Sequence, residues 1–178
     1  MNKIHPELMK NIAIYRNCVA FWGSPLSNFY QCSFTYDNTE WTSSEQCFMA
    51  MKAKFFNDEE TYKQILKAKT PKEAKRFGRL VKNFDTDLWD KERDNVMYDV
   101  LKEKFTQNDD LHDLLLSEKF VNKCFVEGSP VDGIWGVKIS WDDPSIDDKS
   151  NWKGENRMGK TLDRVRQFIL NSEKTDQE

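Results

Sequence analysis

The 178-residue sequence contains few of the side chains that build metal centres and disulfide frameworks. Its two histidines, His5 and His112, lie far apart, and its four cysteines form no Cys-x-x-Cys pair. We therefore expect no metal site and no disulfide scaffold, and reduced thiols fit a cytoplasmic protein. No apolar run approaches the roughly 18 residues that cross a membrane, and the N-terminus lacks the apolar core of a signal peptide. A soluble protein without a membrane partner is expected.

An excess of charge of one sign is absent as well. The 27 basic and 30 acidic residues are mixed along the chain and give a net charge of -3. General binding of duplex nucleic acid through a basic face is therefore not expected, although a local basic pocket is compatible with this balance. Aromatic residues, in contrast, are abundant at 13% of the chain. Such side chains anchor loops, but they also form stacking walls for a planar base.

The local sequence signals predict a mostly helical α+β single domain with a small antiparallel sheet. We expect this domain over residues 11–170, between a loose lead-in of residues 1–10 and a polar tail of residues 171–178. Strands are predicted at residues 12–22, 32–36, 40–42 and 120–126 and, within a loop-rich stretch, near residues 135–141. Helices are predicted at residues 44–56, 58–67, 70–80, 85–105, 109–117 and 159–170.

The helix predicted at residues 44–56 carries two ionisable side chains within its apolar arc. At about 100° per residue, Glu45 and Lys52 fall between the phenylalanine and methionine directions, whereas Lys54 points the opposite way. The two residues are separated by ~10 Å of helix rise, and Lys52 leans back towards the N-terminus, so together they frame a small polar ligand. In the simpler interpretation, Glu45 lies beneath a serine N-cap and Lys52 extends past the aromatic side chains to solvent.

Residues 154–161 match the phosphate-binding pattern G-x-x-x-x-G-K-[ST]. A P-loop requires a buried hydrophobic strand directly before it, whereas residues 147–153 read Asp-Asp-Lys-Ser-Asn-Trp-Lys. No hydrophobic run ending in aspartate follows either. We therefore reject a P-loop, although the segment can still present a helix N-terminus to a phosphate.

The segment at residues 129–136 is denser in turn residues than a simple connection needs. Asp132 either bonds its own backbone in a rigid turn or faces a sugar hydroxyl or base amine. In the second interpretation Trp135 is a stacking wall.

Two helices carry further candidates. Lys75 and Arg79 lie four residues apart and share a face, which is either a solvated basic surface or a clamp for phosphate. Trp89 belongs to the apolar stripe of the helix at residues 85–105, where core packing is the simpler interpretation.

Seven segments, taken in order, resemble the YbiA-like, or NADAR, family of N-glycosidases. They include Phe-Trp-Gly-Ser-Pro-Leu-Ser-Asn-Phe-Tyr at residues 21–30 and Ser-Ser-Glu-Gln-Cys-Phe-Met-Ala-Met-Lys-Ala within residues 41–53. The others lie at residues 74–79, 89–97, 101–108, 129–136 and 154–159. The resemblance covers residues 20–168 and accounts for the glycines of the accidental P-loop pattern. Its one departure is Met158, where the family usually has leucine.

The resemblance implies an N-glycosidase that hydrolyses a bond between ribose C1 and an exocyclic amine, without a metal or another cofactor. Family members remove ADP-ribose from guanine or act on ribosylamino-pyrimidine phosphates of riboflavin synthesis. We favour the first substrate, either as a small molecule or linked to nucleic acid. The alternatives from other classes are a non-catalytic module that binds ADP-ribose or nucleotides and a plain structural domain.

The resemblance also implies roles for individual residues. In one hypothesis Glu45 is a general acid–base or steadies an oxocarbenium-like state. In the other, which we favour, Lys52 attacks C1 to form a Schiff base and Glu45 shuttles protons. Asp132 completes the set of expected catalytic residues. The expected substrate-binding residues are Asn28 and Phe29 at the sugar or base, Lys75, Arg79, Asn156 and Gly159 at phosphate, and Trp89 and Trp135 at the base.

Overall fold

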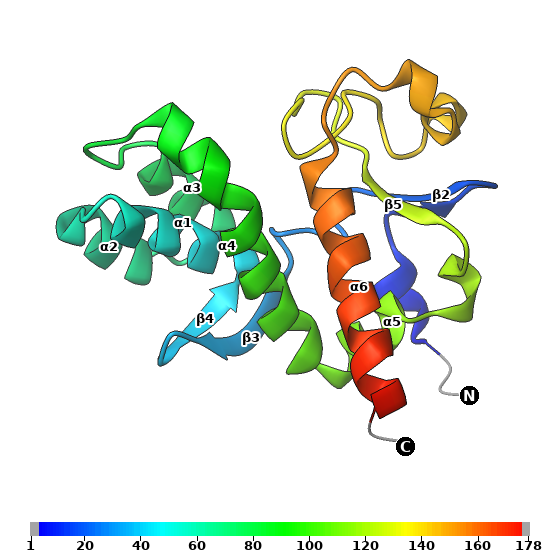
Figure 1. Cartoon of the computed structure of the whole chain (residues 1–178), viewed down its shortest axis with the longest axis horizontal. Coiled ribbons are helices and arrows are strands. Elements are labelled where there is room, and N and C mark those ends of the chain that lie inside the picture. Colours follow the sequence, from blue (N-terminus) through cyan, green and yellow to red (C-terminus); the bar gives the residue numbers. More distant parts are fainter. Residues whose placement is uncertain (1–3, 176–178) are drawn as a thin grey trace. The chain divides into compact units, whose positions relative to one another are not determined.

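The computed structural model describes residues 4–175, so residues 1–3 of the expected lead-in and residues 176–178 of the expected tail lie outside the described part. The chain forms two compact units, each with its own core. Residues 28–108 make up one, the central unit, and residues 1–27 together with 109–178 make up the other, the terminal unit. Figure 1 labels the α-helices and most of the strands.

The central unit begins with a β-hairpin. Strands β3 (Gln31–Tyr36) and β4 (Thr39–Ser43) pair antiparallel, with Phe34 opposite Trp41. The two connecting residues, Asp37 and Asn38, have φ angles of 53° and 56°. Asparagine and aspartate tolerate this left-handed conformation, which a two-residue hairpin turn requires. The predicted hairpin is therefore confirmed.

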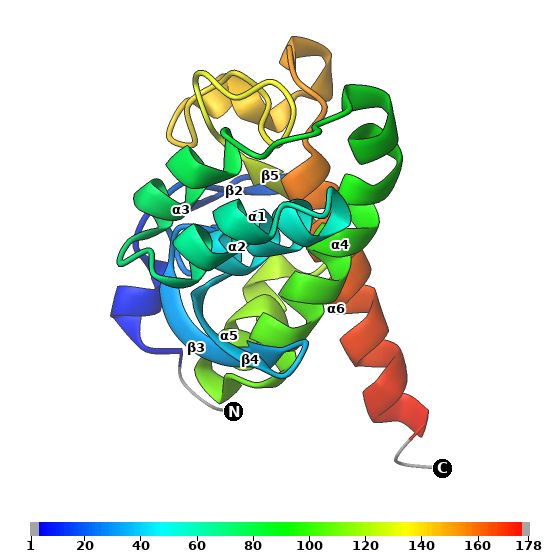
Figure 2. The same ribbon diagram turned by 90° about the vertical axis from the view of Figure 1, so that its left-hand side faces the viewer.

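Four helices complete the central unit: α1 (Ser44–Phe55), α2 (Glu59–Leu66), α3 (Pro71–Gly78) and α4 (Thr86–Thr106). Each begins after a residue whose side chain accepts a hydrogen bond from a backbone N–H of the first turn, namely Ser43, Asp58, Thr70 and Asp85. Helix α1 packs against the other three (Figure 2). All four predicted helices are confirmed, because their capping signals are local.

The terminal unit contains a three-stranded sheet of order β1-β2-β5, formed by β1 (Ile12–Ile14), β2 (Cys18–Phe21) and β5 (Cys124–Glu127). Strand β1 is antiparallel to β2, whereas β5 is parallel to it. Helix α6 (Arg157–Thr175) runs alongside β5 (Figure 1). The remaining elements are α5 (Asp109–Leu115) and the short 3-10 helices η1 (Pro6–Met9), η2 (Glu118–Phe120), η3 (Pro144–Asp147) and η4 (Lys149–Asn151).

The predicted fold class, a mostly helical α+β fold with a small sheet, is confirmed, but the terminal unit departs from the prediction in detail. The strand expected at residues 12–22 is two antiparallel strands, and the expected helix at 159–170 extends from Arg157 to Thr175. The strand expected near residues 135–141 is wrong. There Asp132 accepts hydrogen bonds from the backbone N–H groups of Ile134 and Trp135, and Lys138 has a φ angle of 58°, so the segment turns rather than extends.

Helices α1 and α3 approach closely where α3 ends. Gly78 is buried, and a Cβ atom there would lie 2.0 Å from Sδ and 2.8 Å from Cγ of Met49. Only glycine therefore permits this approach without displacing Met49.

We predict that Gly78→Ala lowers the free energy of unfolding by about 1–3 kcal/mol, the usual cost of an overpacked core. Chemical denaturation measures this loss. In Gly78→Ala/Met49→Ala the new methyl group enters the space that Met49 leaves, so the double variant should be more stable than the sum of the two single losses predicts. Strictly additive losses would contradict the direct contact.

Candidate functional site

The first turn of α1 holds Glu45 in a buried position. Its side chain is only 4% exposed, and its backbone N–H donates a hydrogen bond of 3.1 Å to the carbonyl oxygen of Asn28. The Ser44 hydroxyl donates to the same carbonyl at 3.4 Å. Ser43 caps the helix, as the simpler interpretation expected. The cap explains the helix start, but it does not by itself explain why a carboxylate is buried there.

The amine of Lys52 lies half-buried near the other end of α1. Its Nζ donates a hydrogen bond of 2.9 Å to the carbonyl oxygen of Gly78 and lies 4.2 Å from the centroid of the Phe84 ring. Burial lowers the pKa of Lys52 below the ordinary value of 10.5, and the positive charge of Arg93 lowers this pKa further. The carboxylate of Glu45 acts in the opposite direction. The two residues singled out from the sequence therefore influence each other electrostatically.

Because its charge acts on Lys52, Arg93 is a candidate site residue that the sequence analysis missed. It lies on α4, is 11% exposed in its side chain and forms an ion pair with Asp90. Its Nε atom is buried and has no hydrogen-bond partner within residues 4–175. A signal was present in the sequence: Arg93 falls between Trp89 and Met97 at four-residue spacing, inside the apolar stripe of the helix. An arginine in such a stripe is as unusual as Glu45 and Lys52 are on α1.

Asn28 lies beside the first turn of α1. Its side-chain nitrogen is 3.3 Å from Sδ of Met97, and its Oδ1 atom is buried without a hydrogen-bond partner in the described part of the chain. Buried polar atoms without a partner are uncommon in folded proteins. This acceptor agrees with the expectation that Asn28 contacts a polar ligand, which stays a prediction.

A basic pocket of about 670 Å³ opens on the central unit beside α3. It brings together three of the predicted substrate-binding residues, Phe29, Lys75 and Arg79, and Nζ of Lys75 lies 5.3 Å from the centroid of the exposed Phe29 ring. Its other lining residues are Thr70, Lys72, Glu73 and Arg76. The lining thus contains four basic side chains and one acidic side chain, and this excess of positive charge makes the pocket suitable for phosphate groups.

The single acidic residue of this pocket is committed to the start of α3. Glu73 accepts a hydrogen bond of 2.8 Å from the backbone N–H of Lys69, and its own N–H donates to the Thr70 hydroxyl at 3.1 Å. This arrangement confirms the capping signal at Thr70. Glu73 also forms an ion pair with Arg76 at 3.7 Å. With four basic side chains and this one acidic side chain, the lining of the pocket still carries an excess of three positive charges.

The basic pocket is continuous in sequence with the contacts of Glu45 and Lys52. Phe29 directly follows Asn28, whose carbonyl accepts from the first turn of α1, and Arg79 directly follows Gly78, whose carbonyl accepts from Lys52. We call this set of residues the central-unit site. A carboxylate, an amine and a phosphate-sized basic pocket therefore occur on one compact unit.

Trp89 belongs to the core of the central unit and is not among the residues that line the basic pocket. It is 4% exposed, and its ring packs against Phe48, Phe55 and Phe56 of α1 at centroid distances of 5.4, 5.7 and 6.2 Å. This is the core packing that the simpler interpretation expected. The contact of Trp89 with a base stays a prediction that this geometry does not support, because a buried ring offers little surface for stacking.

Asp132 and Trp135 lie on the terminal unit. One carboxylate oxygen of Asp132 accepts hydrogen bonds of 2.9 Å from the backbone N–H groups of both Ile134 and Trp135. The rigid turn expected as the simpler interpretation is therefore present. The catalytic role of Asp132 and the stacking role of Trp135 stay predictions, and the half-buried ring of Trp135 retains some accessible surface.

Asn156 and Gly159 hold the start of α6 against β5. The buried Asn156 side chain donates to the carbonyl oxygen of Phe125 at 2.9 Å and accepts from the N–H of Glu127 at 3.1 Å. A Cβ on Gly159 would lie 2.0 Å from the Phe125 carbonyl oxygen, so only glycine fits there. Both residues thus serve packing within the unit, and their contact with phosphate stays a prediction.

The packing of the last family segment also explains the accidental P-loop pattern. A Cβ on Gly154 would lie 2.3 Å from the carbonyl oxygen of Gly136, and the N–H of Glu155 donates to the Gly133 carbonyl at 2.9 Å. The two glycine-rich segments therefore pack on each other. The 3-10 helix η4 and a short loop precede Gly154, whereas a P-loop would follow a buried strand.

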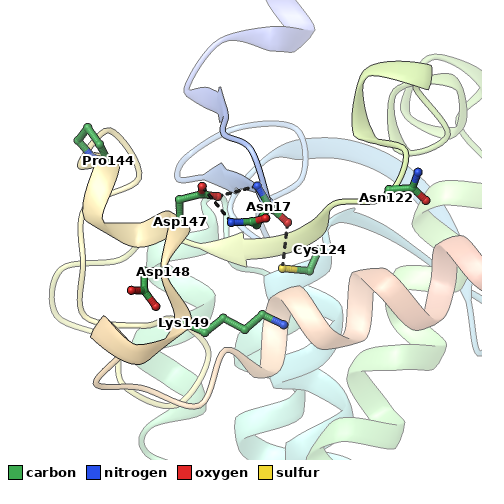
Figure 3. Close-up of a pocket in the computed structure, with 7 residues that line it drawn as sticks. All are labelled: Asn17, Asn122, Cys124, Pro144, Asp147, Asp148 and Lys149. Carbon is green, nitrogen blue, oxygen red and sulfur yellow. Dashed lines mark hydrogen bonds between the residues drawn. The ribbon is translucent and has the colours of Figure 1, made fainter.

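A second hollow, of about 800 Å³, lies on the terminal unit and is shown in Figure 3. Both carboxylate oxygens of Asp147 accept hydrogen bonds from Asn17, at 2.8 and 3.2 Å, and the Asn17 carbonyl oxygen lies 3.7 Å from Sγ of Cys124. The hollow contains none of the predicted site residues, and its hydrogen bonds tie the end of η3 to Asn17, the residue before β2. Among residues 4–175 no cluster of three or more histidine, cysteine or acidic side chains is arranged to hold a metal ion. Of the helices in that range, none is long and apolar enough to span a membrane.

The fold and these motifs place the chain in a known family of enzymes. The NADAR domain model matches residues 20–170, which include all of the central unit and most of the terminal unit. The chain belongs to the NADAR domain family.

Among the relatives of the chain, one is named an N-glycosidase and another a riboflavin biosynthesis protein. N-glycosidase R617 of Acanthamoeba polyphaga mimivirus is 36% identical over 128 residues, which cover 72% of this chain and 74% of that protein. Riboflavin biosynthesis protein VVA0006 of Vibrio vulnificus (strain YJ016) is 33% identical over 145 residues, which cover 81% of this chain and 35% of that protein. The NMR structure of the E. coli protein YbiA matches with a TM-score of 0.72 and 26% identity, covering 94% of this chain and 93% of that one.

We predict that the titration of Lys52 responds in opposite directions to its two charged neighbours. Arg93→Met removes a repulsion that disfavours the ammonium form, so the titration midpoint of Lys52 should rise. Glu45→Gln removes an attraction that favours this form, so the midpoint should fall. Competitive acetylation across the alkaline range, followed by peptide mapping, gives the midpoint.

Two controls accompany this titration. Arg93→Lys keeps the positive charge and should leave the midpoint near that of the wild type. Lys54 lies on the same helix, and its hydrogen bond to Asp37 raises the pKa of Lys54, so it should titrate above Lys52 in every sample. Midpoints of Lys52 that stay equal in Arg93→Met and Glu45→Gln would contradict the electrostatic coupling.

Proposed function

We propose that this chain is an N-glycosidase that hydrolyses the bond between ribose C1 and an exocyclic amine, and that its preferred substrate is ADP-ribosylated guanine in nucleotides or nucleic acid. The observation that carries the proposal is the pairing on α1 of a buried carboxylate, Glu45, with an amine, Lys52, whose pKa is lowered. The names of the relatives support the reaction class. The basic pocket of the same unit supports a phosphorylated substrate.

The chemistry of the substrate explains why an amine is useful. A ribose on an exocyclic amine opens to an imine at C1 more readily than an ordinary nucleoside does. The neutral amine of Lys52 then attacks C1, and the base leaves as its free amine. Water adds to the resulting Schiff base and releases both the sugar and Lys52. Glu45 moves protons during these steps, as a buried carboxylate beside the reacting atoms can.

Direct hydrolysis is the alternative mechanism for the same bond. Glu45 then acts as general acid–base, or it steadies an oxocarbenium-like state at C1. In this mechanism Lys52 binds the substrate without forming a covalent bond. The lowered pKa of Lys52 favours the Schiff base, because only the neutral amine is a nucleophile.

The size and charge of the basic pocket favour ADP-ribose over a sugar with one phosphate. Lys72, Lys75, Arg76 and Arg79 line a space of about 670 Å³ beside the exposed ring of Phe29. A pyrophosphate carries two charged groups for these side chains, and the adenine offers a planar surface for the aromatic ring. The second candidate, a ribosylamino-pyrimidine phosphate, is favoured by the name of the Vibrio vulnificus relative.

A non-catalytic module that binds ADP-ribose or nucleotides is the alternative from another class. It requires the basic pocket but gives no task to Glu45 and Lys52. Burying ionisable groups costs stability unless they are compensated, and perturbed groups of this kind concentrate at functional sites. We therefore favour the enzyme.

We predict that borohydride traps an adduct between the sugar and Lys52 when the protein turns over ADP-ribosylated guanine or a ribosylamino-pyrimidine phosphate. Mass spectrometry of the digest locates the adduct and identifies the released sugar. Lys52→Ala should abolish the adduct, and Glu45→Gln should slow turnover by about 10²–10⁴-fold, the usual contribution of general acid–base catalysis. Lys54→Ala, on the exposed side of α1, is the control and should remain active. Turnover without any trapped adduct would favour direct hydrolysis, and no cleavage of either substrate would refute the proposed reaction.

We predict that the basic pocket binds the phosphates of the substrate. Lys75→Ala or Arg79→Ala should weaken the binding of ADP-ribose about ten- to hundredfold, because a hydrogen bond to a charged group contributes about 1.5–3 kcal/mol. The double variant Lys72→Ala/Arg76→Ala should weaken the binding of ADP-ribose more than the binding of ribose 5-phosphate if the pyrophosphate extends across the pocket. Calorimetry measures both ligands, with Lys63→Ala on α2 as the control. Equal losses for the two ligands would contradict a two-phosphate site.

A further inference from the structure

Phe84 presents an aromatic ring to the amine of Lys52. It lies in the connection between α3 and α4 and is 44% exposed. Its ring contacts Phe56 in an edge-on arrangement, with a centroid distance of 5.3 Å and an interplanar angle of 66°. Nζ of Lys52 lies 4.2 Å from the centroid of the Phe84 ring. The ring is thus oriented by the core on one side and faces a reactive nitrogen on another.

The position of Nζ has an electrostatic consequence. The face of an aromatic ring carries partial negative charge and attracts a cation that lies within about 6 Å of its centroid. A neutral amine gains little from this attraction, whereas an ammonium or a protonated imine on the same nitrogen gains from it. The ring therefore favours whichever reaction step moves positive charge onto Nζ.

We propose that Phe84 is a catalytic residue whose ring stabilises the positive charge of the protonated Schiff base on Lys52. This inference rests on the proposed function, and in particular on its imine step. It assigns to an exposed phenylalanine an electrostatic role that hydrophobic packing does not provide.

The balance of the step shows where the charge moves. Ring opening of the glycosylamine and protonation give an iminium in which the nitrogen of the base carries the positive charge. The lone pair of the neutral Lys52 amine forms the Nζ–C1 bond, and one proton of Nζ passes to the nitrogen of the base. The C1–N bond to the base then breaks, with its electron pair leaving on the base as a neutral amine. One positive charge has moved from the substrate to Nζ, which lies over the Phe84 ring.

Two other aromatic side chains of this cluster, Trp89 and Phe55, pack against neighbouring aromatic rings. Trp89 is buried among the rings of α1. Phe55 is exposed to a similar extent as Phe84, at 41%, and contacts both Phe56 and Trp89, at centroid distances of 4.9 and 5.7 Å. It is therefore a matched control: an exposed phenylalanine in the same aromatic cluster, outside the described contacts of Lys52.

Fluorinated phenylalanines at residue 84 test the proposal. Each added fluorine reduces the partial negative charge on the ring face but changes the shape of the side chain little. The probe is ribose 5-phosphate, whose open-chain aldehyde forms an imine with Lys52 that borohydride reduces to a stable adduct. The rate of adduct formation on Lys52 is measured on the full chain, above the midpoint of the Lys52 titration. There the starting amine is neutral in every variant, so the ring acts on the imine alone.

We expect the rate to fall stepwise with each added fluorine, by about two- to thirtyfold in total, which is the range of a cation–π interaction. Phe84→Leu should be as slow as the most fluorinated ring, and Phe84→Trp should retain the rate. The same fluorinated series at Phe55 should leave the rate unchanged. A structural role of Phe84 would not produce a graded response to fluorine.

The outcomes separate this inference from the proposed function. If the protein cleaves the ribosylated base normally but the rate of adduct formation on Lys52 does not change with fluorination at residue 84, the inference is overturned. The proposed N-glycosidase activity is then unaffected. A graded fluorine response without cleavage of any ribosylated base would refute the proposed function and support the role of the ring. The absence of any adduct on Lys52 would overturn the imine step and, with it, the role of Phe84.

Discussion

The close approach of α1 and α3 at Gly78 is the constraint on which the central-unit site depends. A side chain at residue 78 would collide with Met49, so the approach requires glycine. The same approach brings the Gly78 carbonyl oxygen within 2.9 Å of the Lys52 amine. It also sets the direction in which the chain leaves α3, and the next residue, Arg79, lines the basic pocket. One backbone contact thus fixes both the position of the Lys52 amine and one edge of the basic pocket.

The surroundings of Lys52 combine influences that oppose one another. Burial and the charge of Arg93 favour the neutral amine, whereas the carboxylate of Glu45, the Gly78 carbonyl and the ring of Phe84 favour a positive charge on Nζ. A lysine that alternates between a neutral nucleophile and a cationic imine needs both kinds of neighbour. A lysine that only extended to solvent would need neither. The simpler interpretation of this residue therefore accounts for its contact with an aromatic side chain, but not for the arginine held nearby.

Local signals in the sequence were sufficient for the central unit, and distant pairing was the main difficulty in the terminal unit. The caps at Ser43 and Thr70 and the turn at residues 37–38 depend on neighbouring residues, so these elements were predictable. The parallel pairing of β2 with β5 joins residues more than a hundred positions apart, which no local pattern specifies. Glu45 and Lys52 were recognisable because charges interrupt an apolar arc, and the same criterion applied to α4 identifies Arg93. Phe84 had no such signal, since its exposure and its place over Lys52 arise only from the packing of α1 with the connection after α3.

The charge of Arg93 also bears on the choice between the two mechanisms. An oxocarbenium-like state develops positive charge at C1, and the guanidinium whose charge acts on Lys52 would oppose a positive charge on a sugar bound beside that amine. The same guanidinium assists a Schiff base, because it increases the fraction of Lys52 that is neutral and able to attack. In the proposed mechanism the positive charge of the imine arises on Nζ, which lies 4.2 Å from the centroid of the Phe84 ring, so that the ring offsets part of the repulsion. With an arginine, an aromatic ring and a carboxylate arranged around one amine, the site is better matched to a nucleophilic lysine than to direct displacement by water.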